Sequence, residues 1–175
     1  GCKIVDMDID AAGLITLRKM GHPVGPKSPK KLAAIVEKVH TAGCKFILKG
    51  IMTVADAEEA VTAGVDCIVV SNHGGRVMEY APGTARVLPA IARAVKGQVT
   101  IMVDGGVRSG ADVFKMLALG ADLVGIGRPI VWAAIGGGTE GVSKYIAQVK
   151  GELVQTMVLT GCKNIAAINE DVLFA

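Results

Sequence analysis

The feature that most constrains the fold is a repeated unit of a helix-forming segment, a glycine and a short apolar run. The segment from Ala55, ADAEEAVTAGVDCIVVS, superposes on the segment from Ala111, ADVFKMLALGADLVGIG, with Ala, Asp, Gly and Asp at matching places. The offset of 56 residues corresponds to two units of about 28 residues each. Repeated units of this kind predict parallel strands joined by right-handed helical crossovers. Such regularity favours a (β/α) barrel over an open sheet.

Capping residues mark three of the predicted helices. Each has a Ser or Thr that can cap its first turn and a glycine just past its last turn, where a left-handed backbone is common. The paired start and stop residues are Ser28 and Gly43, Thr53 and Gly64, and Ser109 and Gly120. A further long amphipathic helix is predicted over residues 139–161, followed by a short helix from Asn164.

Five strands are predicted, at residues 2–9, 46–49, 67–70, 99–103 and 123–127. A closed barrel of this type has eight strands and typically about 250 residues. We therefore expect an α/β fold of the (β/α)8 TIM barrel type, with this chain covering roughly strands four to eight and the C-terminal helices. Residues 1–175 are expected to form one domain, the C-terminal part of the barrel.

Composition and charge narrow the class of protein. The 51% hydrophobic and 3% aromatic content fits small, buried parallel strands. No apolar run approaches the roughly 20 residues of a transmembrane helix, and no signal-peptide pattern opens the sequence, so we expect a cytoplasmic protein. The net charge of +3, with both signs interspersed and a single Trp, argues against nucleic acid as a partner.

The cysteines show no metal-binding pattern. Cys2, Cys44, Cys67 and Cys162 fall in no CxxC or Cys/His spacing, so no metal is expected. Cys44 and Cys67 stand at strand entries, where we expect buried free thiols, as suits a reducing compartment.

Polar residues follow four predicted strands at the point where each strand ends. The carboxyl ends of parallel strands meet on one face, where chemistry gathers in α/β folds. Each residue alone could be a solvated charge or a turn former, but four cations and one imidazole at the same edge indicate an anionic ligand. They are Lys49 after residues 46–48; Ser71, His73 and Arg76 after 67–70; Asp104, Gly105, Gly106 and Arg108 after 99–103; and Gly127 and Arg128 after 123–126.

The segment DGGVRSGAD, residues 104–112, predicts a phosphate site. Paired glycines can expose backbone N–H groups, Arg108 adds a fork of donors, and Ser109 opens a helix. The segment GIGR ends the next strand in a similar way. Donors that converge between the last two strands of a barrel are typical of phosphate binding.

Together, these motifs resemble a known family. LKG, VSNHGGR, DGGVRSGADVFKMLALGAD and IGRP, in this order and spacing, closely resemble the C-terminal half of the FMN-dependent 2-hydroxy acid oxidases and dehydrogenases, over about residues 44–163. The family's segment before its fourth strand has no counterpart in this sequence. GGVRSGADV with GRP would also suit a barrel of the IMP dehydrogenase type, but that type uses a catalytic Cys in a loop, and no cysteine here follows a strand end.

The resemblance implies oxidation of a small L-2-hydroxy acid, such as lactate or glycolate, to the 2-oxo acid. His73 would be the catalytic base and would also contact the substrate, whose carboxylate Arg76 would hold. An aspartate on the first strand of this chain would hydrogen-bond His73. The family's spacing indicates Asp8, with Asp6 and Asp10 as close alternatives. A purely structural role for this aspartate, at an acidic strand end or as a helix cap, is an equally good interpretation of the same residues.

The resemblance also implies FMN as the cofactor. Lys49 would stabilise negative charge on the reduced flavin, and Ser71 would touch the ring. The ribityl chain and phosphate would be bound by the remaining group, which comprises Asp104, Gly105, Gly106, Val107, Arg108, Gly127 and Arg128. The electron acceptor, whether oxygen, a quinone or a cytochrome, stays open.

A partial barrel exposes strand edges, so we expect association with an N-terminal half or with further copies of the chain. By itself the chain is expected to be inactive. A catalytically dead fragment that needs such a partner is the alternative function.

Overall fold

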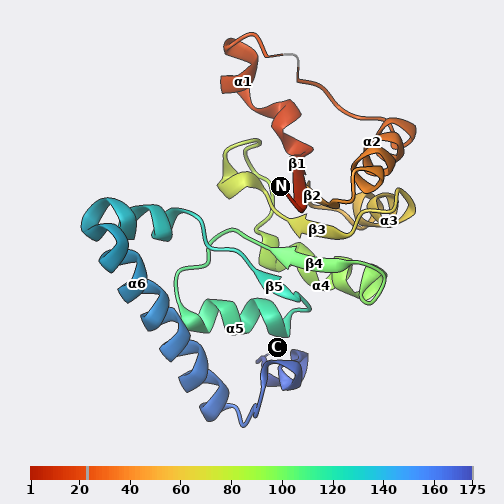
Figure 1. The fold of residues 1–175 in the computed structure, drawn as a ribbon. Helices are drawn as coiled ribbons and strands as arrows, with labels where there is room; N and C mark the ends of the chain where they lie inside the picture. Colours follow the sequence, from red (N-terminus) through yellow and green to blue (C-terminus); the bar gives the residue numbers. More distant parts are fainter. Residues whose placement is uncertain (23, 175) are drawn as a thin grey trace.

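The protein forms one five-stranded parallel sheet, with strands that lie side by side in chain order (Figure 1). The computed structural model describes residues 1–22 and 24–174. The strands are β1 (Ile4–Asp8), β2 (Lys45–Ile51), β3 (Cys67–Val70), β4 (Thr100–Val103) and β5 (Leu123–Val124). Consecutive parallel order is the topology of a barrel segment, which confirms the predicted part of a (β/α)8 fold.

Helices connect successive strands. The longer ones are α2 (Pro29–Thr41), α3 (Val54–Thr62), α4 (Thr84–Val95), α5 (Gly110–Ala118) and α6 (Arg128–Leu159). The short ones are η1 (Asp10–Gly13), α1 (Ile15–Lys19), η2 (His73–Gly75), η3 (Ile165–Ala167) and η4 (Glu170–Val172).

The main core lies between the sheet and the helices. Alternate strand residues such as Leu48, Ile68 and Ile101 point to the helices and are at most 1% exposed. The other alternation, which includes Lys49 on β2, faces the opposite side of the sheet. This division places the polar strand-end residues away from the core.

The predicted helix starts are confirmed. The Ser28 hydroxyl accepts from the Lys31 amide, and the Thr53 hydroxyl accepts from the Asp56 amide at 3.1 Å. Ser109 and Asp112 form a reciprocal capping box at the start of α5. Ser and Thr oxygens satisfy backbone donors that have no partner inside the helix, which fixes where each helix begins.

Asp66, a residue of the sequence repeat, joins a helix–strand loop to the neighbouring strand. Its carboxylate accepts from the Phe46 amide at 2.8 Å and contacts Lys45 and His40 at 2.7 Å. Partial burial by itself would raise the pKa of Asp66, but the hydrogen bonds from Lys45, Phe46 and His40 lower it to about 2. Asp122 repeats the arrangement, because it accepts from the Ile101 amide on the neighbouring strand β4 and pairs with Lys96. The aspartate of each repeat therefore links the loop before its own strand to the neighbouring strand.

The C-terminal helix differs from the prediction. It begins at Arg128, before the expected start at residue 139, and bends at Gly138, where φ is 56° and ψ is −143°. A side chain at Gly141 would overlap the Ala133 carbonyl, so the two parts of α6 meet closely at the bend. The first part of the helix was not predicted because it runs into three consecutive glycines, and glycine is unfavourable inside helices.

All four cysteines are free. Cys67 is buried as predicted, whereas Cys44, in the turn just before β2, is only partly buried. Among the residues that the structure describes, no helix combines the length and apolar character needed to cross a membrane.

Candidate active site

A pocket of about 370 Å³ opens at the carboxyl ends of the strands. Most of the polar residues predicted for the site line it. The lining comprises Lys49, His73, Gly74, Arg76, Asp104, Gly105, Gly106, Val107, Arg108, Gly125, Gly127, Arg128, Pro129 and Val131. Because the strands are parallel and lie in chain order, residues at or just after the carboxyl ends of four strands, β2 to β5, meet in this pocket, as the sequence predicted.

His73 is presented by a strained turn directly after β3. Its φ is 56°, and Gly74 and Gly75 follow with φ of 68° and 77°. A left-handed backbone is uncommon for a histidine and is stabilised here by its surroundings. The buried Ser71 hydroxyl accepts from the His73 amide, and the Asn72 side chain accepts from the Gly75 amide, each at 3.2 Å.

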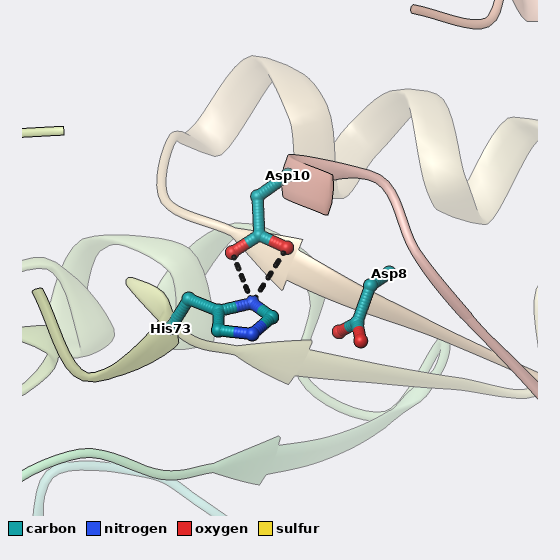
Figure 2. Close-up of side chains that lie close together, drawn as sticks. All are labelled: Asp8, Asp10 and His73. Atoms are coloured by element: carbon teal, nitrogen blue, oxygen red, sulfur yellow. Dashed lines mark hydrogen bonds and ion pairs between the residues drawn. The ribbon is translucent and has the colours of Figure 1, made fainter. Parts of the chain in front are cut away.

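Asp10, and not Asp8, contacts His73 (Figure 2). The Nδ1 atom of His73 lies 3.2 Å from both carboxylate oxygens of Asp10, and the two side chains are only 13% and 14% exposed. The preferred sequence assignment of Asp8 was therefore wrong for this pairing, and the alternative Asp10 is correct. The chain turns into η1 at Asp10, and Gly50 makes room beside it, because a side chain there would overlap Asp10.

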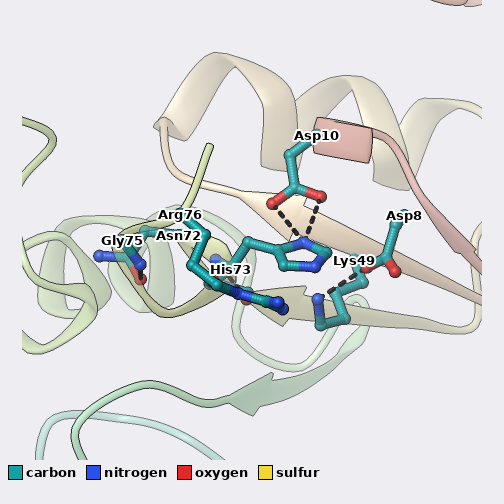
Figure 3. Close-up of polar contacts among 8 residues, drawn as sticks. Asp8, Asp10, Lys49, Asn72, His73, Gly75 and Arg76 are labelled. Carbon is teal, nitrogen blue, oxygen red and sulfur yellow. Dashed lines mark hydrogen bonds and ion pairs between the residues drawn. The ribbon is translucent and has the colours of Figure 1, made fainter. Parts of the chain in front are cut away.

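Asp8 instead pairs with Lys49, as Figure 3 shows. The two residues are direct partners in the β1–β2 register, which places the ammonium 2.7 Å from the carboxylate. Asp6, the other alternative, points to the same face two residues earlier on the strand. Burial and the charge of Asp8 raise the pKa of Asp6, while Lys49 lowers it less.

Ligand atoms of Asp8, Asp10 and His73 lie within 4.8 Å of one another. Lys49 already neutralises Asp8, and Asp10 is engaged with the imidazole. We therefore assign no metal to this group.

Arg76 extends over the same space as His73 and Lys49 (Figure 3). Its Nε donates to the His73 carbonyl at 3.1 Å, which ties the guanidinium to the turn that carries the imidazole. The terminal nitrogens line the pocket and can take a carboxylate in a bidentate manner. An imidazole and a guanidinium that could hold a carboxylate therefore lie together in the pocket.

The other end of the pocket combines a glycine turn with two arginines. Gly105 and Gly106 have φ of 96° and 77°, which leaves the turn free of side chains. Arg108 follows this turn, and Arg128 begins α6, where its guanidinium lies so close to Gly74 that a side chain there would overlap it. Anions bind favourably at such sites.

Asp104 leaves one carboxylate oxygen buried with no hydrogen-bond partner within the described part of the chain. Its carbonyl accepts from Thr84, and its amide donates to Val70, so the backbone is fixed while the side chain is not satisfied. A buried acceptor without a donor is costly, so this oxygen fits a ligand that carries hydroxyl groups.

The amides that begin α5 are not free for a ligand, contrary to what the Ser109 helix start suggested. The Asp112 carboxylate accepts from the Arg108 and Ser109 amides, and Glu152 accepts from the Gly110 amide. Burial would raise the pKa of Asp112, and these amides together with the Ser109 hydroxyl lower it. The start of α6 has no side-chain cap among the residues described, but Pro129 has no N–H and the Ile130 amide donates to the Gly127 carbonyl at 3.0 Å, so this helix start offers few backbone donors and the arginine side chains are the main ones.

Three predicted residues have distinct places. Ser71 is fully buried and does not line the pocket, whereas Val107 lines it although the residue is only 4% exposed. Gly127 caps α6. Sequence reasoning missed Gly125, Pro129 and Val131 as lining residues, because they carry no charge and gave no signal of their own.

Comparisons with known proteins agree on one family. Residues 23–175 match the FMN-dependent dehydrogenase family. An L-lactate oxidase of Lactobacillus jensenii is 50% identical over 137 residues, which is 78% of this chain and 33% of that protein. A peroxisomal (S)-2-hydroxyacid oxidase of Arabidopsis thaliana is 50% identical over 126 residues, which is 72% of this chain and 35% of that protein.

Solved structures show the same likeness. A mandelate oxidase variant with (S)-mandelic acid superposes with a TM-score of 0.84 at 34% identity, covering 96% of this chain and 54% of that one. A lactate oxidase described as from Pediococcus acidilactici also gives 0.84 at 34% identity, covering 96% and 52%. This chain thus spans about half the length of the solved structures that it matches.

Proposed function

This chain belongs to the FMN-dependent dehydrogenase family, and from that premise we propose that it carries the base, the carboxylate site and the cofactor site of an enzyme that oxidises a small L-2-hydroxy acid to the 2-oxo acid. The observation that carries the proposal is the Asp10–His73 contact beside Arg76 in one pocket. An enzyme of this kind needs a proton acceptor within reach of an anchored carboxylate.

The residues present fit FMN. The unpartnered Asp104 oxygen suits ribityl hydroxyl groups, and Gly105 and Gly106 line the same pocket without side chains. Arg108 and Arg128 supply the donors and positive charge that a phosphate needs. When bound, FMN accepts the two electrons that leave the substrate.

His73 is placed to take the proton. Asp10 engages Nδ1, so Nε2 is the nitrogen left to accept a proton from the substrate as its 2-hydroxyl carbon is oxidised. The Asp10 carboxylate stabilises the imidazolium that forms, as the aspartate does in other His–Asp pairs. Arg76 holds the substrate carboxylate, and the reaction then releases a 2-oxo acid, two protons and two electrons.

Lys49 gives the pocket a cation whose charge is offset by Asp8 at 2.7 Å. We assign Lys49 to the stabilisation of negative charge on the reduced cofactor and Ser71 to the support of the His73 turn. The same family likeness covers lactate, 2-hydroxyacid and mandelate enzymes, so the substrate class is a small 2-hydroxy acid.

Activity is expected to need more protein than these five strands. Within the described ranges β1 and β5 each pair with a single neighbouring strand, and Ile4 and Leu123 on them are 53% and 52% exposed. Open edges of this kind are normally covered in native proteins. We propose that further barrel strands, or a second copy of the chain, complete the site.

The test is the visible spectrum of the purified full-length protein. It should be yellow, and it should bleach without oxygen when L-lactate or glycolate is added. His73→Ala should keep the colour and lose the bleaching, while the matched control His22→Ala, at an exposed loop position, should behave as the unmodified protein. A flavin-loaded protein that no 2-hydroxy acid reduces would refute the proposal.

A further inference from the structure

Two aromatic residues of helix α6 contact Arg108, one at its guanidinium and the other at its backbone carbonyl. The Arg108 guanidinium carbon lies 6.0 Å from the centre of the Trp132 ring, within the range of a cation–π contact. The Tyr145 hydroxyl donates to the Arg108 carbonyl at 2.9 Å. Neither aromatic residue lines the pocket, so both reach the cofactor site only through Arg108.

The bend in α6 lets both of these residues serve one arginine. In a straight helix, residues 132 and 145 would be separated by about 20 Å along the axis, at 1.5 Å per residue. The backbone of Gly138 is non-helical, and Gly141 packs against the Ala133 carbonyl with no room for a side chain. The glycine-rich segment between the two aromatic residues therefore has a structural purpose: it turns the second part of the helix back toward the Arg108 loop.

The second part of α6 is anchored next to this loop. Glu152 accepts from the Gly110 amide at 2.8 Å, and Gly110 packs so closely on Leu153 that a side chain would overlap the helix backbone. Burial, Glu152 and Asp112 raise the pKa of Tyr145, so its hydroxyl stays protonated and can donate over the physiological range. The donor at the Arg108 carbonyl is thus held in place.

Arg108 needs this support because few other groups fix its side chain. It is exposed, and its Nη1 donates to the carbonyl of Gly106 two residues earlier at 3.1 Å. A flexible exposed arginine loses considerable rotamer entropy when it binds an anion. An aromatic face under the guanidinium limits that freedom and leaves the in-plane N–H groups available to an anion.

We propose that Trp132 and Tyr145 are positioning residues that hold Arg108 ready for the phosphate of the cofactor, with the glycine bend of α6 as the device that brings them together. The inference rests on the proposed function, because it takes the arginine end of the pocket as the phosphate site. It adds two residues, Trp132 and Tyr145, that the pocket itself does not contain.

Calorimetric titration of the FMN-free full-length protein with FMN, and separately with riboflavin, tests the proposal. Riboflavin lacks the phosphate and reports on the rest of the site. Trp132→Ala should weaken FMN binding roughly 2- to 5-fold and leave riboflavin binding unchanged. Trp132→Phe, which keeps an aromatic face, should stay within about 2-fold of the unmodified protein. Ile135→Ala, at an 81% exposed position on the same helix, is the matched control and should change neither affinity.

A double-mutant cycle separates positioning from general stability. In an Arg108→Gln background, Trp132→Ala should cause no further loss of FMN affinity, because its only route to the phosphate is removed. Tyr145→Phe should weaken FMN alone, by roughly 2- to 10-fold.

Three results would overturn the inference, and they are distinguishable. Equal weakening of FMN and riboflavin by Trp132→Ala would indicate a structural role only. An undiminished Trp132→Ala effect in the Arg108→Gln background would show that the arginine is not the route. Equal affinity of the unmodified protein for FMN and riboflavin would refute the phosphate site itself, and with it the proposed function on which this inference rests.

Discussion

Replacing Asp10 and Asp8 in turn by asparagine tests the central assignment of the site. Both oxygens of Asp10 lie 3.2 Å from His73 Nδ1, and both side chains are largely buried. At that distance two unit charges interact by about 5 kcal/mol at an effective dielectric constant of 20. Asparagine keeps an acceptor oxygen and loses the charge, so we expect a loss nearer that of one charge-assisted hydrogen bond, about 1.5–3 kcal/mol.

This loss of interaction energy raises the barrier of the step in which His73 takes up a proton and its imidazole becomes charged. Asp10→Asn should therefore lower the rate constant of flavin reduction by about 10- to 150-fold. Asp8→Asn should lower it by less than about 5-fold, because the Asp8 carboxylate is already paired with Lys49 at 2.7 Å. The two variants remove the same charge two residues apart, so each is the matched control for the other.

The assay is anaerobic stopped-flow reduction of the FMN-loaded full-length protein by saturating L-lactate or glycolate. The visible spectrum and the thermal midpoint of each variant establish that cofactor and fold are retained. Equal losses in the two variants, or a larger loss in Asp8→Asn, would refute the assignment of Asp10 as the partner of His73.

Other predictions concern the substrate, the pH dependence of stability and helix packing. Arg76→Lys should raise KM for the 2-hydroxy acid by about 10-fold or more with a smaller change in kcat, measured by steady-state kinetics, because a point charge replaces a bidentate fork. Asp66→Asn should lower the free energy of unfolding by about 1–2 kcal/mol at neutral pH. Because the folded-state pKa of Asp66 is lowered to about 2, its stabilisation is complete above the unfolded value of 3.8 and is lost as pH falls toward 2, so urea denaturation should show the difference from the unmodified protein shrinking over that window. Gly110→Ala should lower the free energy of unfolding by more than about 2 kcal/mol, seen as a lower thermal midpoint, because the new methyl group would overlap the Leu153 backbone, and no decrease would contradict the close α5–α6 contact.

Local sequence signals located most of the fold. Ser28, Thr53 and Ser109 cap helices in the structure as their patterns predicted, because a cap depends on only a few neighbouring residues. The long helix was the exception. Its first part, from Arg128, contains a glycine run that local propensity disfavours, and packing against the Arg108 loop and the second part of the helix overrides that preference.

The alternation of strand residues and the parallel order of the strands also predicted most of the candidate site. The periodicity of two fixes which residues share a face, and the parallel order fixes which ends meet, so the sequence alone groups Lys49, His73 and Arg76, which line one pocket in the structure. The same argument could not choose among Asp6, Asp8 and Asp10. All three follow one alternation: Asp6 and Asp8 lie on β1, whereas Asp10 lies beyond the strand, where the chain turns into η1.

The sequence by itself therefore determined the parallel order of the units, the edge at which the polar residues gather, and the kind of ligand that they attract. Only the tertiary structure decided which carboxylate meets which partner, since the β1–β2 register assigns Asp8 to Lys49 and the turn into η1 carries Asp10 over to His73. It also decided that Trp132 and Tyr145 meet one arginine. These contacts join residues 24 to 63 positions apart, where distance along the chain carries no information about distance in space.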